Sequence, residues 1–189
     1  MDSLYHKKER KRICQGDILE DFQKTIPIYN KEKTEIEGYV EFTFPYVVIL
    51  SQDCDLRQDA ENRSLPDENE KHNEILQSVL IIPAFMSEEL RDGSHLLGLG
   101  IKTVHLNGTI WNSIERNNNK RYYFLKKDDK FTMPSLAIDF KIHYTIKIED
   151  IYKIYNEKYK ISIKNLFRES ISRNFSNYIS RIGLPELKK

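Results

Sequence analysis

A continuous apolar stretch that ends abruptly in polar side chains constrains this 189-residue chain more than any other feature. Residues 46–50 read Tyr-Val-Val-Ile-Leu, and the chain continues without a spacer as Ser-Gln-Asp-Cys-Asp-Leu-Arg over residues 51–57. An unbroken, β-branched run is typical of a strand that is covered on both faces. The sequence therefore predicts a central strand whose end presents short polar side chains at the rim of a core, where rigid scaffolds commonly carry function.

The composition predicts one globular domain without an overall charge bias. Hydrophobic residues make up 39% of the chain and charged residues 31%, and 30 Lys and Arg against 29 Asp and Glu leave a net charge of +1. A chain of this length can bury one core and does not need a second domain. The near-neutral total does not mark a nucleic-acid-binding protein by charge alone, although it can hide a local basic patch.

Sequence signals of secretion, membrane insertion and metal binding are weak. The N-terminus is polar and charged, and no apolar run is long enough to span a bilayer. The two cysteines, Cys14 and Cys54, are far apart in sequence, and neither belongs to a CxxC pair. We therefore expect a cytoplasmic protein with reduced thiols, no membrane partner and no cofactor.

Alternating and apolar patterns predict an antiparallel sheet with short helices in its loops. The expected strands cover residues 25–29, 36–44, 46–50, 75–83, 121–125 and 136–148, with a turn at 31–33 and a bend at Pro45. Short helices are expected at 87–90 and 109–116, the second ended by three asparagines. The acidic, proline-containing stretch 58–73 is expected to be an exposed loop or a loop with a short helix.

The two ends of the chain have contrasting patterns. Apolar residues recur at intervals of three and four near the C-terminus, which predicts a long amphipathic helix over 162–183 that stops at Gly183. Residues 1–12 contain five Lys and Arg, which predicts a flexible basic arm, or alternatively an arm that contacts phosphates. The remaining residues, 13–189, form the predicted single domain. Its fold class is α+β: an SH3-like small β-barrel or a strongly bent antiparallel sheet.

Four short motifs, in order, resemble the MazF/PemK toxin family of SH3-like barrels that cleave RNA. They are Gly16-Asp17-Ile18, the valine-rich strand that ends at Leu50-Ser51, the strand that ends at Pro83, and the Ser135-x-x-x-Asp139 strand. The resemblance covers about half of the chain. It implies a barrel fold and a protein that acts on or binds RNA, with a homodimer as one form of assembly.

The chain departs from this family at the catalytic positions. The family carries an arginine just before the Leu-Ser strand and a Thr or Ser just after the proline, and these stabilise the charged phosphorane and assist proton transfer. The matching places here hold Phe44-Pro45-Tyr46 and Ala84-Phe85. The chain is also similar to uncharacterised bacterial proteins that share Gly-Asp-Ile, Ser-Gln-x-Cys-Asp-Leu and Arg-Ile-Gly-Leu-Pro. The third motif corresponds to Arg181–Pro185, and this resemblance implies no activity.

The polar rim after the central strand supplies the candidate catalytic residues, Asp53, Cys54, Asp55 and Arg57. Cys54 as a nucleophile would need a cation or histidine nearby, whereas its flanking carboxylates raise a thiol pKa. A metal held together with His72 or His95 matches no known ligand spacing. A structural role, in which the Asp residues and Gln52 cap a turn or helix, Cys54 packs as a small hydrophobe and Arg57 neutralises a carboxylate, is the interpretation that the residues favour most. The remaining alternative is a rim of short polar groups that recognises a partner or a nucleotide. Candidate substrate-binding residues are Gly16, Asp17, Ser51, Gln52 and Arg121, expected around one groove.

Three functions remain open from the sequence. The first is a MazF/PemK-like protein that acts on or binds RNA, in a toxin or phage-defence system. The second is a catalytically inactive barrel that serves as a protein-interaction module, through the C-terminal helix or the 58–73 loop. The third is a metal- or thiol-dependent hydrolase that uses the Asp53-Cys54-Asp55 rim.

Overall fold

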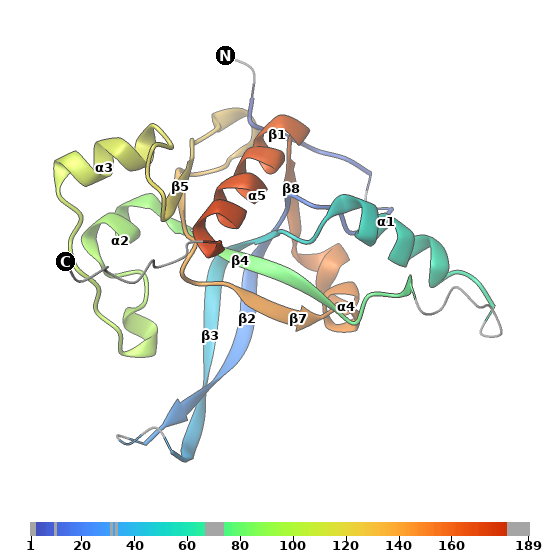
Figure 1. Cartoon of the computed structure of the whole chain (residues 1–189), viewed down its shortest axis with the longest axis horizontal. Coiled ribbons are helices and arrows are strands. Elements are labelled where there is room, and N and C mark those ends of the chain that lie inside the picture. Colours follow the sequence, from blue (N-terminus) through green and yellow to red (C-terminus); the bar gives the residue numbers. More distant parts are fainter. Residues whose placement is uncertain (1–2, 10, 31, 33, 67–73, 181–189) are drawn as a thin grey trace, which may run out of the picture.

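The computed structural model describes residues 3–9, 11–30, 32, 34–66 and 74–180, and in them the strands form one antiparallel sheet (Figure 1). Along the sheet the order is β1-β8-β2-β3-β4-β6-β5, and β7 pairs with the other half of β4. The strands are β1 (Tyr5–His6), β2 (Asp17–Tyr29), β3 (Ile36–Ile49), β4 (Ser78–Met86), β5 (Tyr122–Leu125), β6 (Leu136–Asp139), β7 (Tyr144–Lys147) and β8 (Tyr159–Ile163).

The helices lie in the connections and at the C-terminal end of the described chain. They are α1 (Asp53–Asn62), α2 (Ser87–Asp92), α3 (Gly108–Glu115), α4 (Ile148–Lys158) and α5 (Asn165–Ile179), with 3₁₀ turns at Leu97–Leu99 and Asp129–Phe131. The predicted short helices at 87–90 and 109–116 are thereby confirmed as α2 and α3. Of the stretch 58–73, predicted as a loop or a loop with a short helix, residues 58–62 belong to α1, and residues 67–73 lie outside the described part.

The central strand separates two hydrophobic clusters. Val47 and Ile49 of β3 pack into a cluster that includes apolar side chains of α1, α2, α3 and α4. Val48 and Leu50 point the other way, into a cluster that Ile171 and Phe175 of α5 complete. Each buried aliphatic side chain of this kind stabilises the fold by about 1.5–3 kcal/mol. The prediction that the apolar run is a strand covered on both faces is confirmed.

The two ends of the sheet approach each other without pairing. The Tyr5 hydroxyl, on β1, donates a hydrogen bond of 3.4 Å to the carbonyl oxygen of Lys126, just beyond β5. No strand ladder joins β1 to β5 among the described residues. The architecture is therefore mixed α and β, with a strongly bent antiparallel sheet that stays open, and closure into a barrel is not observed.

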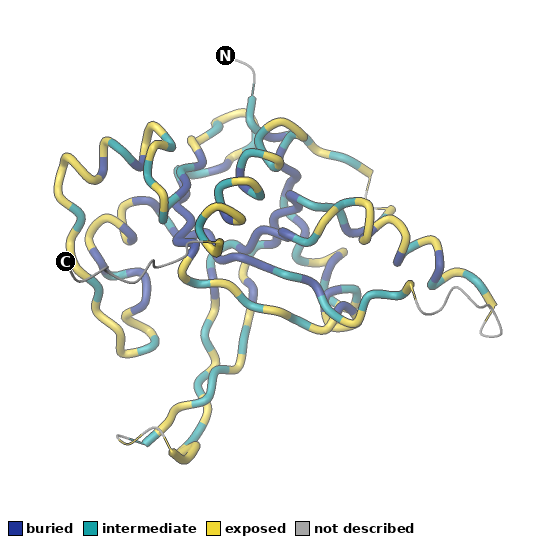
Figure 2. Tube along the Cα trace, viewed as in Figure 1, coloured by how far each residue is buried: buried dark blue, intermediate teal, exposed yellow. Residues whose placement is uncertain are grey.

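A long hairpin, the β2–β3 arm, projects from the body of the molecule (Figure 1). The exposure of the chain rises along it toward the tip, as Figure 2 shows. The expected pairing of its two strands is confirmed, and β3 runs through Pro45 as one strand instead of breaking there. The backbone distortion lies instead on the neighbouring strand, at Asp21, which has a φ of 50°. Asp21 is opposite Pro45, which has no N–H group to donate to the strand pairing.

The prediction of a flexible arm over residues 1–12 is wrong for the residues that the structure describes. β1 pairs with β8, and Tyr5 is 1% exposed within the cluster under α5. Lys8 and Arg12 form ion pairs with Asp17 and Asp53. The buried ring of Tyr5 and the pairing of β1 with β8 therefore hold this segment against the body of the protein, although its many charges predicted a solvated arm.

The C-terminal helix begins later than predicted. Residues 159–163 form β8, with Ile161 and Ile163 buried in the sheet, and α5 runs from Asn165 to Ile179. Apolar residues of a strand and of the following helix had merged into one apparent period. Residues 181–183 of the predicted helix, and the Arg181–Pro185 motif, lie outside the described residues.

The expected strand over 136–148 is two strands, β6 and β7, separated by a turn at residues 140–143. The turn is held by Asp139, which accepts hydrogen bonds from the backbone N–H groups of Lys141 and Ile142. It contains no glycine or proline, so the sequence carried no sign of it. The helix that follows, α4, was not predicted, although Ile148, Ile151 and Tyr155 recur at helical spacing and are buried.

Candidate functional site

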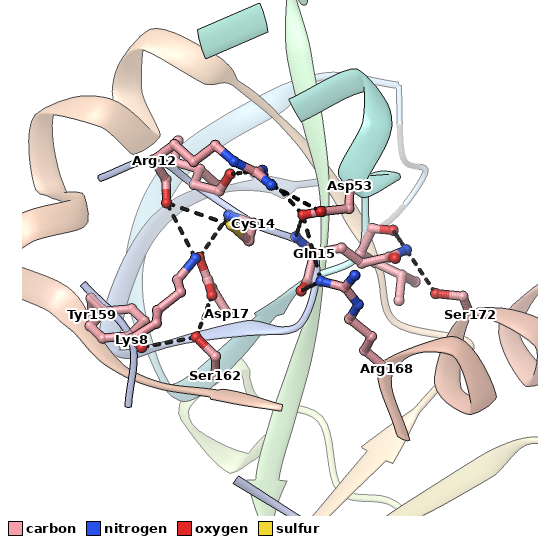
Figure 3. A network of polar contacts seen from close by, with 12 residues as sticks. Lys8, Arg12, Cys14, Gln15, Asp17, Asp53, Tyr159, Ser162, Arg168 and Ser172 are labelled. Atoms are coloured by element: carbon pink, nitrogen blue, oxygen red, sulfur yellow. Dashed lines mark hydrogen bonds and ion pairs between the residues drawn. The ribbon is translucent and has the colours of Figure 1, made fainter. Parts of the chain in front are cut away.

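Asp53, in the first turn of α1, is a junction between three segments of the chain (Figure 3). Arg12 donates to both of its oxygens, with Nη1–Oδ1 at 3.1 Å and Nη2–Oδ2 at 2.9 Å. The backbone N–H of Gln15 donates to Oδ1 at 3.2 Å, and Nη1 of Arg168, on α5, lies 3.6 Å from the same oxygen. Partial burial alone would raise the pKa of Asp53, but the two arginines outweigh it and lower that pKa.

Asp17, at the start of β2, is fully buried and hydrogen-bonded on both oxygens. Oδ2 accepts from Lys8 Nζ at 2.9 Å, from the Cys14 backbone N–H at 2.7 Å and from the Tyr155 hydroxyl at 2.6 Å. Oδ1 accepts from the Ser162 hydroxyl at 2.6 Å. A buried carboxylate with this many donors joins β2 to α4, β8 and the N-terminal segment. Its structural role accounts for all of its contacts.

Lys8, Arg12 and Arg168 contact these two carboxylates, and Lys164 adds a positive charge near His6. We call Lys8, Arg12, Lys164 and Arg168 the cationic cluster. Lys8, Arg12 and Arg168 each keep 18–25% of their side-chain surface exposed. Arg12 and Arg168 share one carboxylate, and Lys164 forms no ion pair within the described part of the chain. The cluster therefore holds two more positive charges than Asp17 and Asp53 neutralise.

His6 lies among the same charges. Burial lowers its pKa, and the charges of Lys8, Lys164 and Arg168 lower it further, against an opposing effect of Asp17. Two buried nitrogens here, Nδ1 of His6 and Nε of Arg168, have no hydrogen-bond partner among the described residues. Buried donors and acceptors are nearly always paired. The site is thus electropositive and has unused hydrogen-bonding capacity.

The predicted catalytic rim forms the first turn of α1, whose N-cap residue, Gln52, makes no side-chain capping hydrogen bond. Of its four residues, Asp53 is tied to Arg12, whereas Cys54, Asp55 and Arg57 are exposed on α1. The Cys54 thiol contacts Gln52 and Asp55 side chains, and Arg57 lies 3.9 Å from Glu61 along the helix. Acidic residues in the first turn stabilise the N-terminus of a helix. Of the structural interpretation, only the placement of carboxylates in the first turn matches these contacts, since Cys54 is exposed and Arg57 pairs with Glu61.

Three of the predicted substrate-binding residues have structural contacts in this region: Ser51 and Gln52 between β3 and α1, and Gly16 just before β2. The Ser51 hydroxyl accepts from the Leu80 N–H at 2.8 Å, which joins the end of β3 to β4, and Gln52 is the exposed N-cap position of α1. Gly16 has a φ of 84°, and a Cβ there would lie 3.0 Å from Cβ of Arg168. Only glycine fits this turn without strain, which brings β2 against α5.

Arg121 lies apart from the other candidates. It pairs through two hydrogen bonds with Asp139, on the neighbouring strand β6, with Nε–Oδ1 at 2.8 Å. Its guanidinium also lies over the ring of Tyr122, 4.8 Å from the centroid. These contacts therefore do not support the expected single groove around Gly16, Asp17, Ser51–Arg57 and Arg121. Asp17, Gly16 and Asp53 come together, and Arg121 has its own partners.

Sequence reasoning did not identify the residues that make this site electropositive. Lys8 and Arg12 fall in the predicted basic arm, and Lys164 and Arg168 fall in the predicted C-terminal helix, because charge in a sequence does not reveal its neighbours. Cys14 also belongs to the site, and burial raises its thiol pKa. It is a free cysteine, as is Cys54.

Metal ligands do not gather in the described part of the chain: no three His, Cys, Asp or Glu side chains are close enough to hold an ion. The predicted metal- or thiol-dependent hydrolase stays a prediction without a supporting contact. None of the described helices combines the length and the apolar character needed to cross a membrane. Comparison with protein-family models, with curated proteins and with solved structures finds no match for this chain.

Proposed function

We propose that this protein acts on or binds RNA, and that its bent sheet is a divergent SH3-like barrel of the MazF/PemK kind from a toxin or phage-defence setting. The observation that carries the proposal is the cationic cluster, in which Arg12 and Arg168 share a single carboxylate, Asp53. Phosphate contacts from Lys and Arg supply most of the affinity of proteins for nucleic acid. Guanidinium groups suit phosphate oxygens because they donate in a planar fork.

The accessible charges of the cluster support binding to a backbone. Arg12 and Arg168 are each partly exposed, so an oxygen of a phosphate can reach them without unfolding the segment. Lys164 adds a positive charge that no described carboxylate pairs. Because the family's catalytic arginine and hydroxyl are replaced, the residues at these positions favour binding over cleavage, and cleavage is measured in a separate gel assay.

The test is titration of a fluorescein-labelled single-stranded RNA of about 12 nucleotides and mixed sequence, read by anisotropy at several salt concentrations between about 50 and 200 mM. We expect Lys164→Ala to weaken binding about 3- to 10-fold and to reduce the salt slope by about one. Lys102→Ala is the matched control, because Lys102 is an exposed lysine outside the cluster. Equal affinities for the two variants, or no retention of RNA by the wild type, would reject the proposal.

The same RNA, analysed on a gel after incubation with wild type, Cys54→Ala and Asp55→Ala, measures cleavage. Cleavage that either substitution abolishes would return the chemistry to the rim at residues 51–57. Binding with intact RNA in all three samples would assign the protein a binding role alone.

A second candidate function, an interaction module that forms a homodimer, is favoured by the β2–β3 arm. Four large apolar side chains near its end are 46–66% exposed: Ile28, Tyr29, Ile36 and Tyr39. Soluble monomers rarely expose such a patch without an interaction that uses it. Light scattering of Tyr39→Lys against Val104→Lys, which changes an exposed valine away from the arm, tests it. A wild-type monomer would exclude this candidate.

A further inference from the structure

The segment that joins α2 to α3 folds back on itself beside the base of the β2–β3 arm (Figure 1). We call residues 94–106 the α2–α3 loop. The end of the loop is held against its start, since the Thr103 N–H donates to the Gly93 carbonyl at 3.1 Å and the Leu106 N–H donates to the Arg91 carbonyl at 2.8 Å. A compact loop whose ends lie close together is an Ω-loop, a class of surface loop that is frequently functional.

The α2–α3 loop is attached to the sheet by side chains and not by its backbone. Among the described residues, every backbone–backbone hydrogen bond of the loop stays within residues 89–106. Leu96 is 7% exposed in the cluster that also contains the central strand, and a Cβ at Gly98 would lie 2.8 Å from the ring of Phe42, on β3. Segments attached in this way open separately from the core of a protein. The loop can therefore leave the sheet without breaking a strand ladder.

His95 is the titratable side chain at the contact between this loop and the sheet. It is 8% exposed, and its ring lies edge-on to the ring of Phe85, on β4, with 4.7 Å between the centroids. Neither ring nitrogen has a hydrogen-bond partner among the described residues. A neutral imidazole is tolerated in such a place, whereas an imidazolium would be a buried charge without a hydrogen-bonded partner, which is far more costly.

The groups that face His95 come from three further elements. Burial lowers the pKa of His95, and it outweighs the Asp139 carboxylate, on β6, and the Glu89 carbonyl, on α2, which both raise that pKa. The guanidinium of Arg121, just before β5, lowers it further. Asp139 is already bound by Arg121 through two hydrogen bonds, so its negative charge is largely neutralised where His95 lies.

The other charged side chains of the α2–α3 loop, Lys102 and His105, are exposed. Nδ1 of His105 lies 3.5 Å from Oδ1 of Asp92, at the end of α2. A proton on His105 strengthens this pair, which holds the end of the loop against α2. His105 therefore favours the closed loop as the pH falls, and His95 favours the open one.

We propose that the α2–α3 loop is a pH-dependent cover, which lifts from the sheet when His95 takes up a proton and thereby uncovers Phe42 and Phe85. At neutral pH the ring is uncharged and the loop stays closed. As the pH falls, the open form, in which water surrounds the imidazole, binds a proton more tightly than the closed form, so its population rises. Uncovering Phe42 extends the apolar surface of the β2–β3 arm. The cover operates without RNA and stands apart from the proposed function.

Hydrogen exchange of individual amides, followed by NMR, measures this opening. We expect the open fraction reported by the Leu99, Ile101 and Leu106 amides, corrected for intrinsic exchange rates, to rise about 3- to 10-fold from about pH 6.5 to about pH 5.5. Amides of the β3–β4 ladder should keep their protection over the same range. No change in the loop amides, or an equal rise in both sets, would overturn the proposal, because an equal rise reports unfolding of the whole protein.

Substitution of His95 identifies the group responsible. His95→Leu and His95→Phe carry apolar side chains that do not titrate, and both should abolish the pH dependence of loop exchange. Lys102→Gln, at an exposed position of the same loop, is the matched control and should retain it. NMR titration of the ring in the wild type needs no variant and should give a His95 pKa below 6.5. A pKa at or above 6.5, or a pH dependence that persists without His95, would overturn the proposal.

Discussion

Arg12 and Asp53 form a bidentate ion pair that joins the segment before β2 to the first turn of α1. The two residues are 41 positions apart, and each keeps a quarter of its side-chain surface exposed. Bidentate Arg–carboxylate pairs are stronger and more directional than ordinary surface pairs. This contact holds Arg12 in the cationic cluster and makes Asp53 a positioning group for it.

Replacement of Asp53 tests this contact against its neighbour. We expect Asp53→Asn to lower the free energy of unfolding by about 1–3 kcal/mol, because hydrogen bonds to a charged partner are lost. Asp55→Asn, on the same helix turn but exposed, should change it by less than about 0.5 kcal/mol. Urea denaturation of both variants measures the difference, and equal losses would contradict the role given to Asp53.

Asp17 should be the more costly carboxylate to neutralise. Asp17→Asn places an amide N–H₂ group against donors that now bond to an oxygen and leaves Lys8 without its partner. We expect a loss of about 3–5 kcal/mol in unfolding free energy. The control is Asp21→Asn, since Asp21 is exposed and asparagine tolerates its positive φ. A stable Asp17→Asn variant would show that the buried hydrogen bonds contribute little.

His6 should make stability depend on pH near neutrality. Burial, Lys8, Lys164 and Arg168 hold its pKa in the fold below the ordinary histidine value of 6.5, against the opposing charge of Asp17. Between the two values the unfolded chain binds more protons, so the free energy of unfolding rises with pH and falls as the solution becomes acidic. Urea unfolding from pH 7.5 to pH 5 should therefore show a flatter dependence for His6→Gln than for wild type. Lys7→Gln, which changes an exposed side chain next to His6, is the control.

Asn117 should protect the β5 edge. The Asn117 side chain accepts from the Phe124 N–H and donates to the Phe124 carbonyl, and Asn117→Gly removes both hydrogen bonds while glycine still permits the φ of 54°. We therefore expect a loss of about 1–3 kcal/mol in unfolding free energy. We also expect self-association that increases with concentration, because the edge of β5 becomes free to pair. Asn118→Gly removes an exposed side chain from the neighbouring position and is the control. Denaturation together with light scattering gives both quantities, and indistinguishable variants would remove the capping role.

The apolar pattern predicted the centre of the fold because it depends on local alternation. Val47 and Val48 point into opposite clusters, and an uninterrupted run is what a strand between two clusters requires. The pattern did not predict the boundaries between elements where no glycine or proline marks them. The turn after Asp139 and the junction at Lys164 contain neither glycine nor proline, so strands and helices merged across them.

The candidate site was less accessible to sequence reasoning because it depends on contacts between distant segments. Asp53 was identified from the polar rim, but its partners Arg12 and Arg168 lie 41 and 115 positions away. Tyr5, a single aromatic among charges, was the one signal that the N-terminal segment docks. Charge alone does not distinguish a solvated lysine from one beside a buried carboxylate.

The measurement that tests the central claim most directly is photocrosslinking of the wild-type protein to a 12-nucleotide RNA that contains 4-thiouridine, with the modified peptides mapped by mass spectrometry. The account predicts crosslinks in residues 4–12 and 164–173, which contain the cationic cluster. Crosslinks confined to the β2–β3 arm or to residues 51–57, with none in those two segments, would contradict it.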